Sequence, residues 1–191
     1  MRIVSGFLKG KPIDFLKSSS TRPLRDFVKE SVFNVVKHSN IINMTLEDNN
    51  ILDLYSGVGS FGIECISNGA KKAFFVENNV TALSVLKKNL KDLKIQDKCT
   101  IFETNIMSFF KRINKKIKFE IIFLDPPFTE NFFIQDLKTL KDSKIYTKNH
   151  IVIIHREKKS KDDLKDIIDV VLTKTYGRSR IIFGNFNSNI S

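Results

Sequence analysis

Residues 50–62 read Asn-Ile-Leu-Asp-Leu-Tyr-Ser-Gly-Val-Gly-Ser-Phe-Gly, a short apolar run that leads into a glycine-rich turn. Short apolar runs bounded by turn residues are typical of buried strands. Glycines let the backbone approach a ligand closely, and the first turn of a following helix directs free N–H groups toward it. The stretch therefore predicts a strand, a ligand-facing loop and a helix in direct succession.

The same pattern repeats along the chain, because short apolar runs alternate with amphipathic segments. This alternation is typical of parallel strands joined by crossover helices. Two final runs, 170–176 and 180–186, predict an antiparallel pair at one edge. We expect an α/β fold, a doubly wound and mostly parallel seven-stranded sheet with an antiparallel last strand. The other expected strands are 50–55, 72–77, 99–103, 119–124 and 150–155, and the expected helices lie near 60–68, 79–93, 106–113, 131–141 and 161–167.

The N-terminal part of the chain precedes this pattern. Residues 1–16 contain two short apolar pieces separated by glycines, which predict a β-hairpin. Apolar residues at helical spacing after Pro23 predict a helix over 21–38. A chain of 191 residues is long enough for one substantial core and too short for two. We expect a hairpin appendage over 1–20 and one main domain over 21–191, linked by the helix.

The chain is basic, with 32 Lys and Arg against 21 Asp and Glu and a formal net charge of +11. Clustered basic side chains bind phosphates, so the charge is compatible with a nucleic-acid ligand. It is equally compatible with solvated lysine-rich faces. Residues 1–29 hold seven basic and two acidic side chains. The basic side chains that we expect to face solvent or RNA are Lys9, Lys11, Arg22, Arg25 and Lys29.

Several classes of protein are disfavoured by what the sequence lacks. No apolar run approaches the roughly 20 residues that a membrane-spanning helix needs, and no hydrophobic signal core follows the N-terminus. Cys65 and Cys99 lie in different expected elements without a Cys-x-x-Cys pair or a nearby His cluster. We therefore expect a soluble, cytoplasmic and monomeric protein with no metal and with two reduced, buried cysteines.

The glycine-rich loop has the spacing Gly-x-Gly-x-x-Gly, and Glu77 stands twenty residues after Gly57 at the end of the second expected strand. A dinucleotide site shares this spacing. Three features favour S-adenosylmethionine instead, namely the acid Asp53 at the strand end, a single nucleotide-binding half and an Asp-Pro-Pro-Phe loop two strands further on. The alternative for the glycines is a tight turn without a ligand.

Two polar residues after later strands complete this candidate cofactor site. Glu77 would accept hydrogen bonds from both ribose hydroxyls, although strands also often end on a solvated charge. The amide of Asn105 suits the edge of adenine and equally suits a helix N-cap. The candidate cofactor-binding residues are Asp53, Tyr55, Ser56, Gly57, Gly59, Gly62, Glu77, Asn78, Asn105 and Ile106.

Residues 122–128 read Ile-Phe-Leu-Asp-Pro-Pro-Phe, an apolar run that stops on a carboxylate, two prolines and a ring. Prolines lack the N–H group and fix φ, so the chain leaves the strand in a stiff turn. The lone pair of an exocyclic base amine is delocalised into the ring. If Asp125 and the Pro126 carbonyl accept its two hydrogens, the nitrogen can pyramidalise toward an electrophilic methyl group.

The ring of Phe128 could stack on a base that has been unstacked from its neighbours. The alternative for this loop is a rigid strand exit without chemistry. The candidate catalytic residues are Asp125, Pro126, Pro127 and Phe128.

Taken together, these residues resemble the bacterial 16S rRNA guanine-N2 methyltransferase family of the small ribosomal subunit, almost from end to end. The Asp-Pro-Pro-aromatic loop is shared with DNA adenine methyltransferases, and the N-terminal segment separates the two. The motifs that carry the resemblance are Arg2–Gly6, Lys9–Lys11, Thr21–Asp26, Phe33-Asn34, Asp53–Gly62 with Glu64, Gly69-Ala70, Glu77, Asn105 with Met107–Phe109, Asp125–Phe128 and Tyr176-Gly177.

The resemblance implies a class I, Rossmann-like methyltransferase that uses S-adenosylmethionine to methylate the N2 amine of one guanine in 16S rRNA of the assembling small subunit. It implies that Asp125 and its loop hold the guanine and that Arg22 lies near cofactor and substrate. The residues that it assigns to the cofactor are Asp53, Gly57, Gly59, Glu77 and Asn105.

Leu24 stands where the family commonly has Thr, and Phe27 where it commonly has a basic residue, so the substrate contacts stay open. Two alternatives are an adenine-N6 methyltransferase acting on DNA or RNA and a noncatalytic RNA-binding assembly factor with the same fold.

Overall fold

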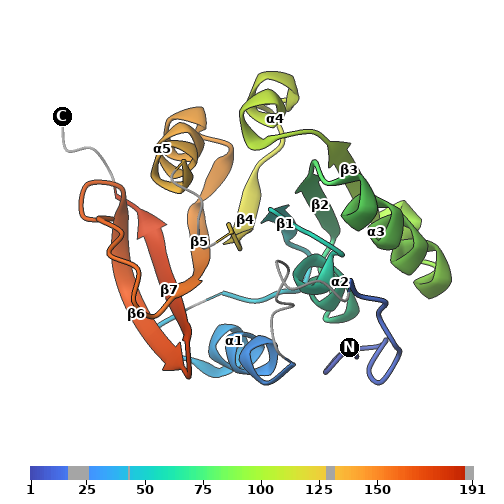
Figure 1. Cartoon of the computed structure of the whole chain (residues 1–191). Helices are drawn as coiled ribbons and strands as arrows, with labels where there is room; N and C mark the ends of the chain where they lie inside the picture. Colours follow the sequence, from blue (N-terminus) through green and yellow to red (C-terminus); the bar gives the residue numbers. More distant parts are fainter. Residues whose placement is uncertain (17–25, 43, 128–131, 188–191) are drawn as a thin grey trace.

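The structure is a computed structural model that describes residues 1–16, 26–42, 44–127 and 132–187 (Figure 1). A seven-stranded sheet with the order β3-β2-β1-β4-β5-β7-β6 forms its centre. The elements are α1 (Asp26–His38), β1 (Asn50–Leu54), α2 (Ser60–Ser67), β2 (Lys72–Glu77), α3 (Val80–Leu93), the 3-10 turn η1 (Gln96–Lys98), β3 (Cys99–Glu103), α4 (Ile106–Arg112), β4 (Phe119–Leu124), α5 (Phe133–Ser143), β5 (Tyr146–Glu157), β6 (Ile168–Tyr176) and β7 (Ser179–Phe186).

Strands β1 to β5 run parallel, β7 is antiparallel to β5, and β6 is antiparallel to β7. This arrangement confirms the expected doubly wound, mostly parallel sheet. The strand order reverses between β1 and β4, whose ends pair through Leu54 and Leu124. Ligands of such sheets bind at the carboxyl ends of the strands next to this reversal. The two loops singled out in the sequence therefore lie side by side at that point.

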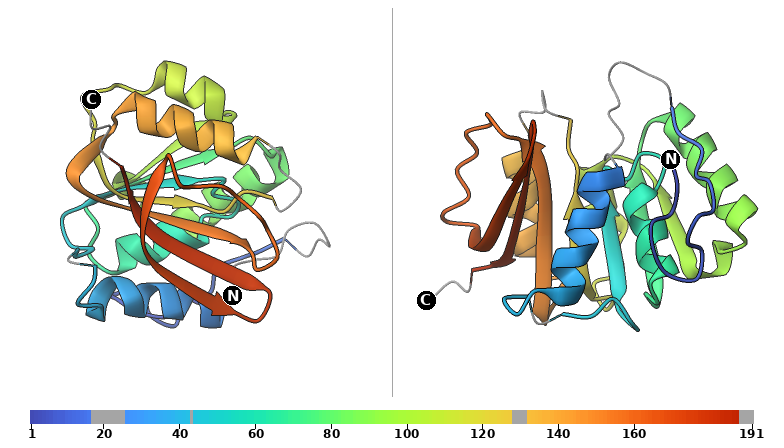
Figure 2. Two further views of the ribbon diagram at one scale, coloured as in Figure 1. Left: turned by 90° about the vertical axis from the view of Figure 1, so that its left-hand side faces the viewer. Right: turned by 90° about the horizontal axis from the view of Figure 1, so that it is seen from below.

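Helices cover both faces of the sheet, with α1, α2 and α3 on one face and α4 and α5 on the other (Figures 1 and 2). Successive strand residues point to opposite faces. Ile51 of β1 accordingly belongs to the apolar cluster under α1 to α3, whereas Leu52 and Leu54 belong to the cluster under α4 and α5. Burial on both faces explains why the central strands read as nearly continuous apolar runs.

The N-terminal segment 1–16, for which a β-hairpin was expected, contains no regular strands and forms an antiparallel turn with a single bridge between Arg2 and Pro12. The N–H of Ile3 donates to the Lys11 carbonyl at 3.0 Å, and the N–H of Ile13 donates to the Met1 carbonyl at 2.9 Å. Ile3, Leu8 and Ile13 are buried in the cluster under α1 to α3. The segment is therefore packed into the same core as these helices.

A buried ion pair fastens this segment to α1 and α2. The side chains of Lys29 and Glu64 are both fully buried, and the Lys29 Nζ lies 3.1 Å from the Glu64 Oε2. The Glu64 carboxylate also accepts from the backbone N–H groups of Val4 at 3.0 Å and Ser5 at 2.8 Å. Lys29 in turn donates to the Arg2 carbonyl at 2.9 Å. The expectation that Lys29 faces solvent or RNA is wrong, because α1 turns this residue toward the N-terminal segment.

One expected helix is absent from the described part of the chain. Residues 161–167 form an irregular segment with a turn at its end. Leu164 and Ile167 are buried, and the N–H of Ile167 donates to the Leu164 carbonyl at 2.9 Å. These two side chains supply apolar contact over a single turn, which is too little to stabilise an amphipathic helix. The charged residues between these two apolar positions gave the segment an amphipathic pattern, which explains why a helix was predicted.

Other elements differ from expectation mainly at their ends. Strand β5 is twelve residues long, against the six of 150–155, since it begins at Tyr146 and continues through a register shift relative to β4 before Ile151. The expected helix start at 21–25 lies outside the described residues. Cys65 is buried as expected, whereas Cys99 is partly exposed. None of the helices in the described ranges has the length and apolar character that a bilayer crossing requires.

We predict that Glu64→Ala lowers the free energy of unfolding by about 3–5 kcal/mol, because it leaves the buried Lys29 ammonium without its carboxylate. The double variant Lys29→Met/Glu64→Gln removes both charges and keeps an acceptor for the backbone amides, so we expect a smaller loss. Urea unfolding of both variants measures the difference. A Glu64→Ala loss below about 1 kcal/mol would contradict this account of the N-terminal segment.

Candidate functional site

The candidate site lies at the carboxyl edge of the sheet, where the loops after β1, β2, β3 and β4 are joined by backbone hydrogen bonds. The N–H of Ser56 donates to the Val76 carbonyl at 3.1 Å, and the N–H of Thr104 donates to the Glu77 carbonyl at 2.9 Å. The N–H of Asp125 lies 3.4 Å from the Leu54 carbonyl. The glycine-rich loop and the Asp-Pro-Pro loop are therefore neighbours in space.

The glycines of the first loop have two different roles. Gly57 has φ +54°, and a Cβ placed there would meet nothing within 4 Å, so its backbone faces open space. A Cβ at Gly59 would lie 2.4 Å from Leu86, and a Cβ at Gly62 would lie 2.4 Å from Phe75. Gly57 thus leaves room for a ligand, whereas Gly59 and Gly62 allow α2 to pack closely on its neighbours.

Asp53 is 1% exposed, and its Oδ2 accepts from the Gly62 N–H at 3.0 Å. Burial raises the pKa of this carboxyl well above its ordinary value, and the nearby charges of Asp125 and Glu77 raise it further against the opposing Gly62 hydrogen bond. Three acidic groups thus surround one small region. A positively charged ligand group would relieve their mutual repulsion.

Glu77 accepts hydrogen bonds from the loop beside it. Its Oε2 accepts from the Gly57 N–H at 2.7 Å, and its Oε1 accepts from the N–H groups of Asn78 at 2.9 Å and Asn79 at 2.8 Å. This carboxylate is partly buried at the end of β2. The hydrogen bond with Gly57 holds the Glu77 carboxylate beside the loop position that faces open space.

Asn105 is the N-cap of α4, because its Oδ1 accepts from the Ser108 N–H at 2.8 Å. The N-cap role, which the sequence offered as the alternative to an adenine contact, is therefore observed. The Asn105 side chain is also exposed beside the candidate cofactor site. Ile106 packs in the core under α4 and α5. The Ile106 side chain therefore contributes to core packing.

The loop residues Tyr55 and Ser56 bond to neighbouring elements. The Tyr55 hydroxyl donates to the Asp136 carboxylate on α5, and the Ser56 hydroxyl lies 3.4 Å from the Val76 carbonyl. The side chains of Tyr55 and Ser56 thus bond to neighbouring elements, and it is the backbone of these two residues that forms part of the ligand-facing loop.

The Asp-Pro-Pro loop carries a partly exposed acid. The Asp125 side chain is 27% exposed, and its Oδ1 lies 2.8 Å from the Nδ1 of His155 on β5. His155 Nε2 lies 2.9 Å from the Ser179 Oγ on β7. Pro126 is buried and Pro127 is exposed. The loop thus presents one carboxylate at the strand-order reversal and is backed by polar side chains of β5 and β7.

Arg156 supports the same loop from the next position on β5. It binds Asp162 through Nε and Nη2 at 3.0 and 3.1 Å, and its guanidinium lies 4.7 Å from the centre of the Phe133 ring. Its Nη1 lies 3.5 Å from the Pro127 carbonyl. Arg180 adds a second contact to Asp162 at 3.4 Å. Partial burial favours a raised pKa for Asp162, but Arg156, Ser160 and Arg180 outweigh burial and lower that pKa below its ordinary value.

His155 and Arg156 were missed in the sequence. A usable signal was present, since a His-Arg pair at the end of the fifth expected strand must reach the same edge as Asp125 on the neighbouring parallel strand. His155 was assigned only to the expected strand 150–155, and Arg156 was assigned to no element.

The remaining predicted contacts fall into two groups. Lys9 and Lys11 are exposed as expected. The residues Arg22, Leu24, Arg25 and Phe128, and the side chain of Phe27, lie outside what the structure describes. Within the described ranges, no cluster of His, Cys, Asp and Glu could hold a metal ion.

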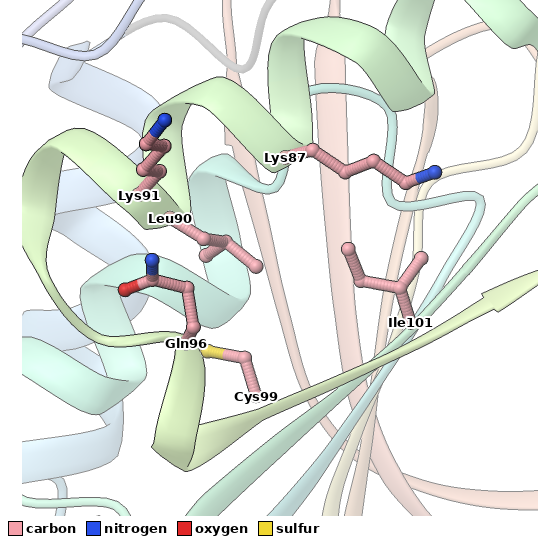
Figure 3. Close-up of a pocket in the computed structure, with 6 residues that line it drawn as sticks. All are labelled: Lys87, Leu90, Lys91, Gln96, Cys99 and Ile101. Atoms are coloured by element: carbon pink, nitrogen blue, oxygen red, sulfur yellow. The ribbon is translucent and has the colours of Figure 1, made fainter.

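A hollow of about 380 Å³ lies elsewhere, between α3 and the first half of β3 (Figure 3). Leu90 and Ile101 form its apolar floor, and Lys87 and Lys91 stand at its rim. None of the candidate site residues lines it. The hollow is therefore distinct from the carboxyl edge of the sheet.

The strand order, the glycine-rich loop and the acidic carboxyl edge define the fold of a class I S-adenosylmethionine-dependent methyltransferase. Residues 1–185 match the family described as "Conserved hypothetical protein 95". The chain belongs to this family, the family of ribosomal RNA small subunit methyltransferase D, which confirms the resemblance that the sequence motifs indicated.

Three similar proteins illustrate the match. "Ribosomal RNA small subunit methyltransferase D" of Haemophilus influenzae is 31% identical over 159 residues, 83% of this chain and 79% of that protein. "Putative rRNA methyltransferase YlbH" of Bacillus subtilis is 31% identical over 180 residues, 93% of this chain and 94% of that protein. The crystal structure of a "putative methylase" from Haemophilus influenzae has a TM-score of 0.77 at 27% identity and covers 97% of this chain and 98% of its own.

We predict that Asp162→Asn destabilises the protein by about 1.5–3 kcal/mol at neutral pH, because the bidentate pair with Arg156 loses its charge. The folded-state pKa of Asp162 is lowered, so this contribution is present above the ordinary carboxyl value of 3.8 and is lost as the pH falls through the lower folded value. Urea unfolding at pH 7 and at acidic pH tests both parts. The exposed Asp166→Asn variant is the control, and an equal loss in the two variants would contradict the prediction.

Proposed function

We propose that this protein transfers a methyl group from S-adenosylmethionine to the exocyclic N2 amine of a guanine in 16S rRNA, presented by the small ribosomal subunit or its assembly intermediate. The observation that carries the proposal is the Asp125 carboxylate, which stands partly exposed at the strand-order reversal beside the glycine-rich loop. Relatives named as ribosomal RNA small subunit methyltransferases support the choice of substrate.

The residues at the carboxyl edge fit S-adenosylmethionine in charge and shape. Asp53 would favour the ammonium and sulfonium charges, since an added cation offsets the cost of its burial beside Glu77 and Asp125. Glu77 would exchange its Gly57 hydrogen bond for the ribose hydroxyls. The open face of Gly57 leaves space for the amino-acid part, and the exposed Asn105 would border the adenine. The bound cofactor supplies an electrophilic methyl group on a positively charged sulfur.

The Asp-Pro-Pro loop would prepare the target amine for attack. One oxygen of Asp125 is already engaged by His155, which leaves the second oxygen for one hydrogen of the amine. The Pro126 carbonyl would accept the other hydrogen, so that the nitrogen pyramidalises and its lone pair becomes available. As the new C–N bond forms, the bond between the methyl carbon and sulfur would break, its electron pair would stay on the sulfur, and a neutral thioether would leave. The surplus proton of the nitrogen would pass to the Asp125 carboxylate or to water. This sequence needs neither a metal nor a covalent intermediate with the protein.

Substrate contacts follow from the loop and the N-terminal segment. Phe128 would stack on the unstacked guanine, and Arg22 and Arg25 would bind phosphates near it. Lys9 and Lys11 are exposed on the N-terminal segment and would add to this basic surface. Lys29 has no place in this set, since its ammonium is buried against Glu64.

We predict that Asp125→Ala lowers methyl transfer by at least about 100-fold while cofactor affinity changes little, because Asp125 acts on the amine of the substrate. The assay follows tritiated methyl groups into small subunits that lack the modification, and calorimetry measures cofactor binding. Nucleoside analysis of the product should give N2-methylguanosine. Retained activity would refute the role of Asp125, and N6-methyladenosine as product would instead support an adenine-N6 methyltransferase.

We predict that the affinity for S-adenosylmethionine rises with pH, from the ordinary carboxyl value of 3.8 up to the raised pKa of Asp53. The pKa of Asp53 is raised in the free protein, so some of the carboxyl is protonated at acidic pH, and a bound cation favours its ionised form. Binding then releases a proton, and affinity increases until the pH exceeds the raised pKa. In Asp53→Asn the affinity should be lower by about 10-fold or more and nearly independent of pH over this range, although Glu77 and Asp125 are retained. The same pH slope in wild type and variant would exclude Asp53 as its source.

A further inference from the structure

We propose that His155 is a positioning residue for methyl transfer, which fixes the Asp125 carboxylate so that one of its oxygens faces the target amine. The proposal rests on the role proposed for Asp125 above. It assigns a function to a histidine on a different strand, which lies about thirty residues further along the chain.

The sheet places the two side chains together. Strands β4 and β5 are parallel neighbours and pair Leu124 with Ile154, so the next residues along each strand, Asp125 and His155, stand opposite one another. The Nδ1 of His155 lies 2.8 Å from the Asp125 Oδ1, a normal hydrogen-bond distance. The His155 side chain is 6% exposed, against 27% for Asp125. His155 is therefore a buried residue that hydrogen-bonds to the more accessible Asp125 carboxylate.

The hydrogen bonds of His155 indicate which atom carries the proton in its contact with Asp125. An ionised carboxylate only accepts hydrogen bonds, so the proton of the contact belongs to His155 Nδ1. On the other side of the ring, Nε2 lies 2.9 Å from the Ser179 hydroxyl, which can donate to a neutral imidazole. Ser179 begins β7, the strand that pairs with β5 on its outer side. The ring is thus held from both sides in an orientation that donates to Asp125.

The three side chains have the connectivity of a hydrolytic triad, but their exposure is reversed. In a Ser-His-Asp triad the serine meets the substrate and the buried acid orients the histidine. Here the acid stands at the candidate site, and the serine lies on the far side of the buried histidine. The chain of contacts therefore ends on Asp125, and the group that it orients is the carboxylate.

Fixing the carboxylate has a direct effect on the reaction. Without the His155 donor, the two oxygens of Asp125 are equivalent and the group can rotate about its terminal torsion, which has a broad energy well. With the donor, Oδ1 is engaged and Oδ2 is available to accept from the amine. Misplacement of a reacting group by about 1 Å can cost about 100-fold in rate. Loss of His155 should therefore lower kcat more than it changes substrate or cofactor binding.

The backbone of the Asp-Pro-Pro loop is also contacted by a residue of β5. Arg156, the next residue of β5, points to the opposite face and lies 3.5 Å from the Pro127 carbonyl. Its pair with Asp162 holds the guanidinium in place. The end of β5 thus contacts the side chain of Asp125 on one face and the backbone of the loop on the other.

Asparagine and glutamine at position 155 give a matched test. The amide nitrogen of Asn can occupy the place of the histidine Nδ1 and donate to Asp125, whereas that of Gln extends toward the place of Nε2 and Ser179. We expect His155→Leu and His155→Gln to lower kcat by about 10- to 100-fold with KM for the small subunit and cofactor Kd within about twofold of wild type. His155→Asn should stay within about fivefold of the wild-type kcat.

The result that overturns the proposal is a kcat for His155→Leu and His155→Gln within about twofold of wild type, or an Asn variant as slow as the Gln variant. Thermal unfolding of each variant checks the fold, and if the leucine variant does not fold, the Asn and Gln pair carries the comparison. A wild-type protein without methyl transfer, or an active Asp125→Ala variant, would instead refute the proposed function. Active wild type, inactive Asp125→Ala and unchanged His155→Gln would refute only the positioning role.

Discussion

The parallel pairing of β1 with β4 is the constraint on which the rest of the site depends. It brings Leu54 and Leu124 into register although 70 residues separate them in the chain. Asp53 is the last residue but one of β1 and Asp125 directly follows β4, so both acids lie at the edge where the strand order reverses. Burial then sets their different properties, because Asp53 is enclosed beside the glycine-rich loop while Asp125 stays accessible. One pairing thus joins a candidate cofactor loop to a candidate substrate loop.

A second constraint fastens the N-terminal segment to this domain. The buried Glu64 carboxylate binds the amides of Val4 and Ser5 and pairs with Lys29 of α1. Buried ion pairs contribute little net stability compared with apolar packing, but they are costly to break and define one arrangement. The segment and α1 are therefore held to α2, the helix that follows the glycine-rich loop. In the proposed function this contact connects the basic N-terminal surface with the site of methyl transfer.

Much of the fold could be predicted from the sequence because local signals decide it. Apolar runs buried on both faces marked the strands, and the glycine-rich loop and Asp125-Pro126-Pro127 marked the functional edge. What the sequence did not reveal depends on tertiary contacts. Lys29 looked like an exposed helix residue because its partner Glu64 comes from another helix, and His155 looked like a strand residue because its partner lies on the neighbouring strand. The charged segment 161–167 resembled a helix, but the contacts of Asp162 with Arg156 and Arg180 favour an irregular path.

We propose that this chain methylates the N2 amine of a guanine in 16S rRNA. The most direct measurement is mass spectrometry of 16S rRNA nucleosides from cells with and without the gene. We expect one N2-methylguanosine to disappear when the gene is absent and to return when the wild-type gene is restored. Unchanged N2-methylguanosine in cells without the gene would contradict it.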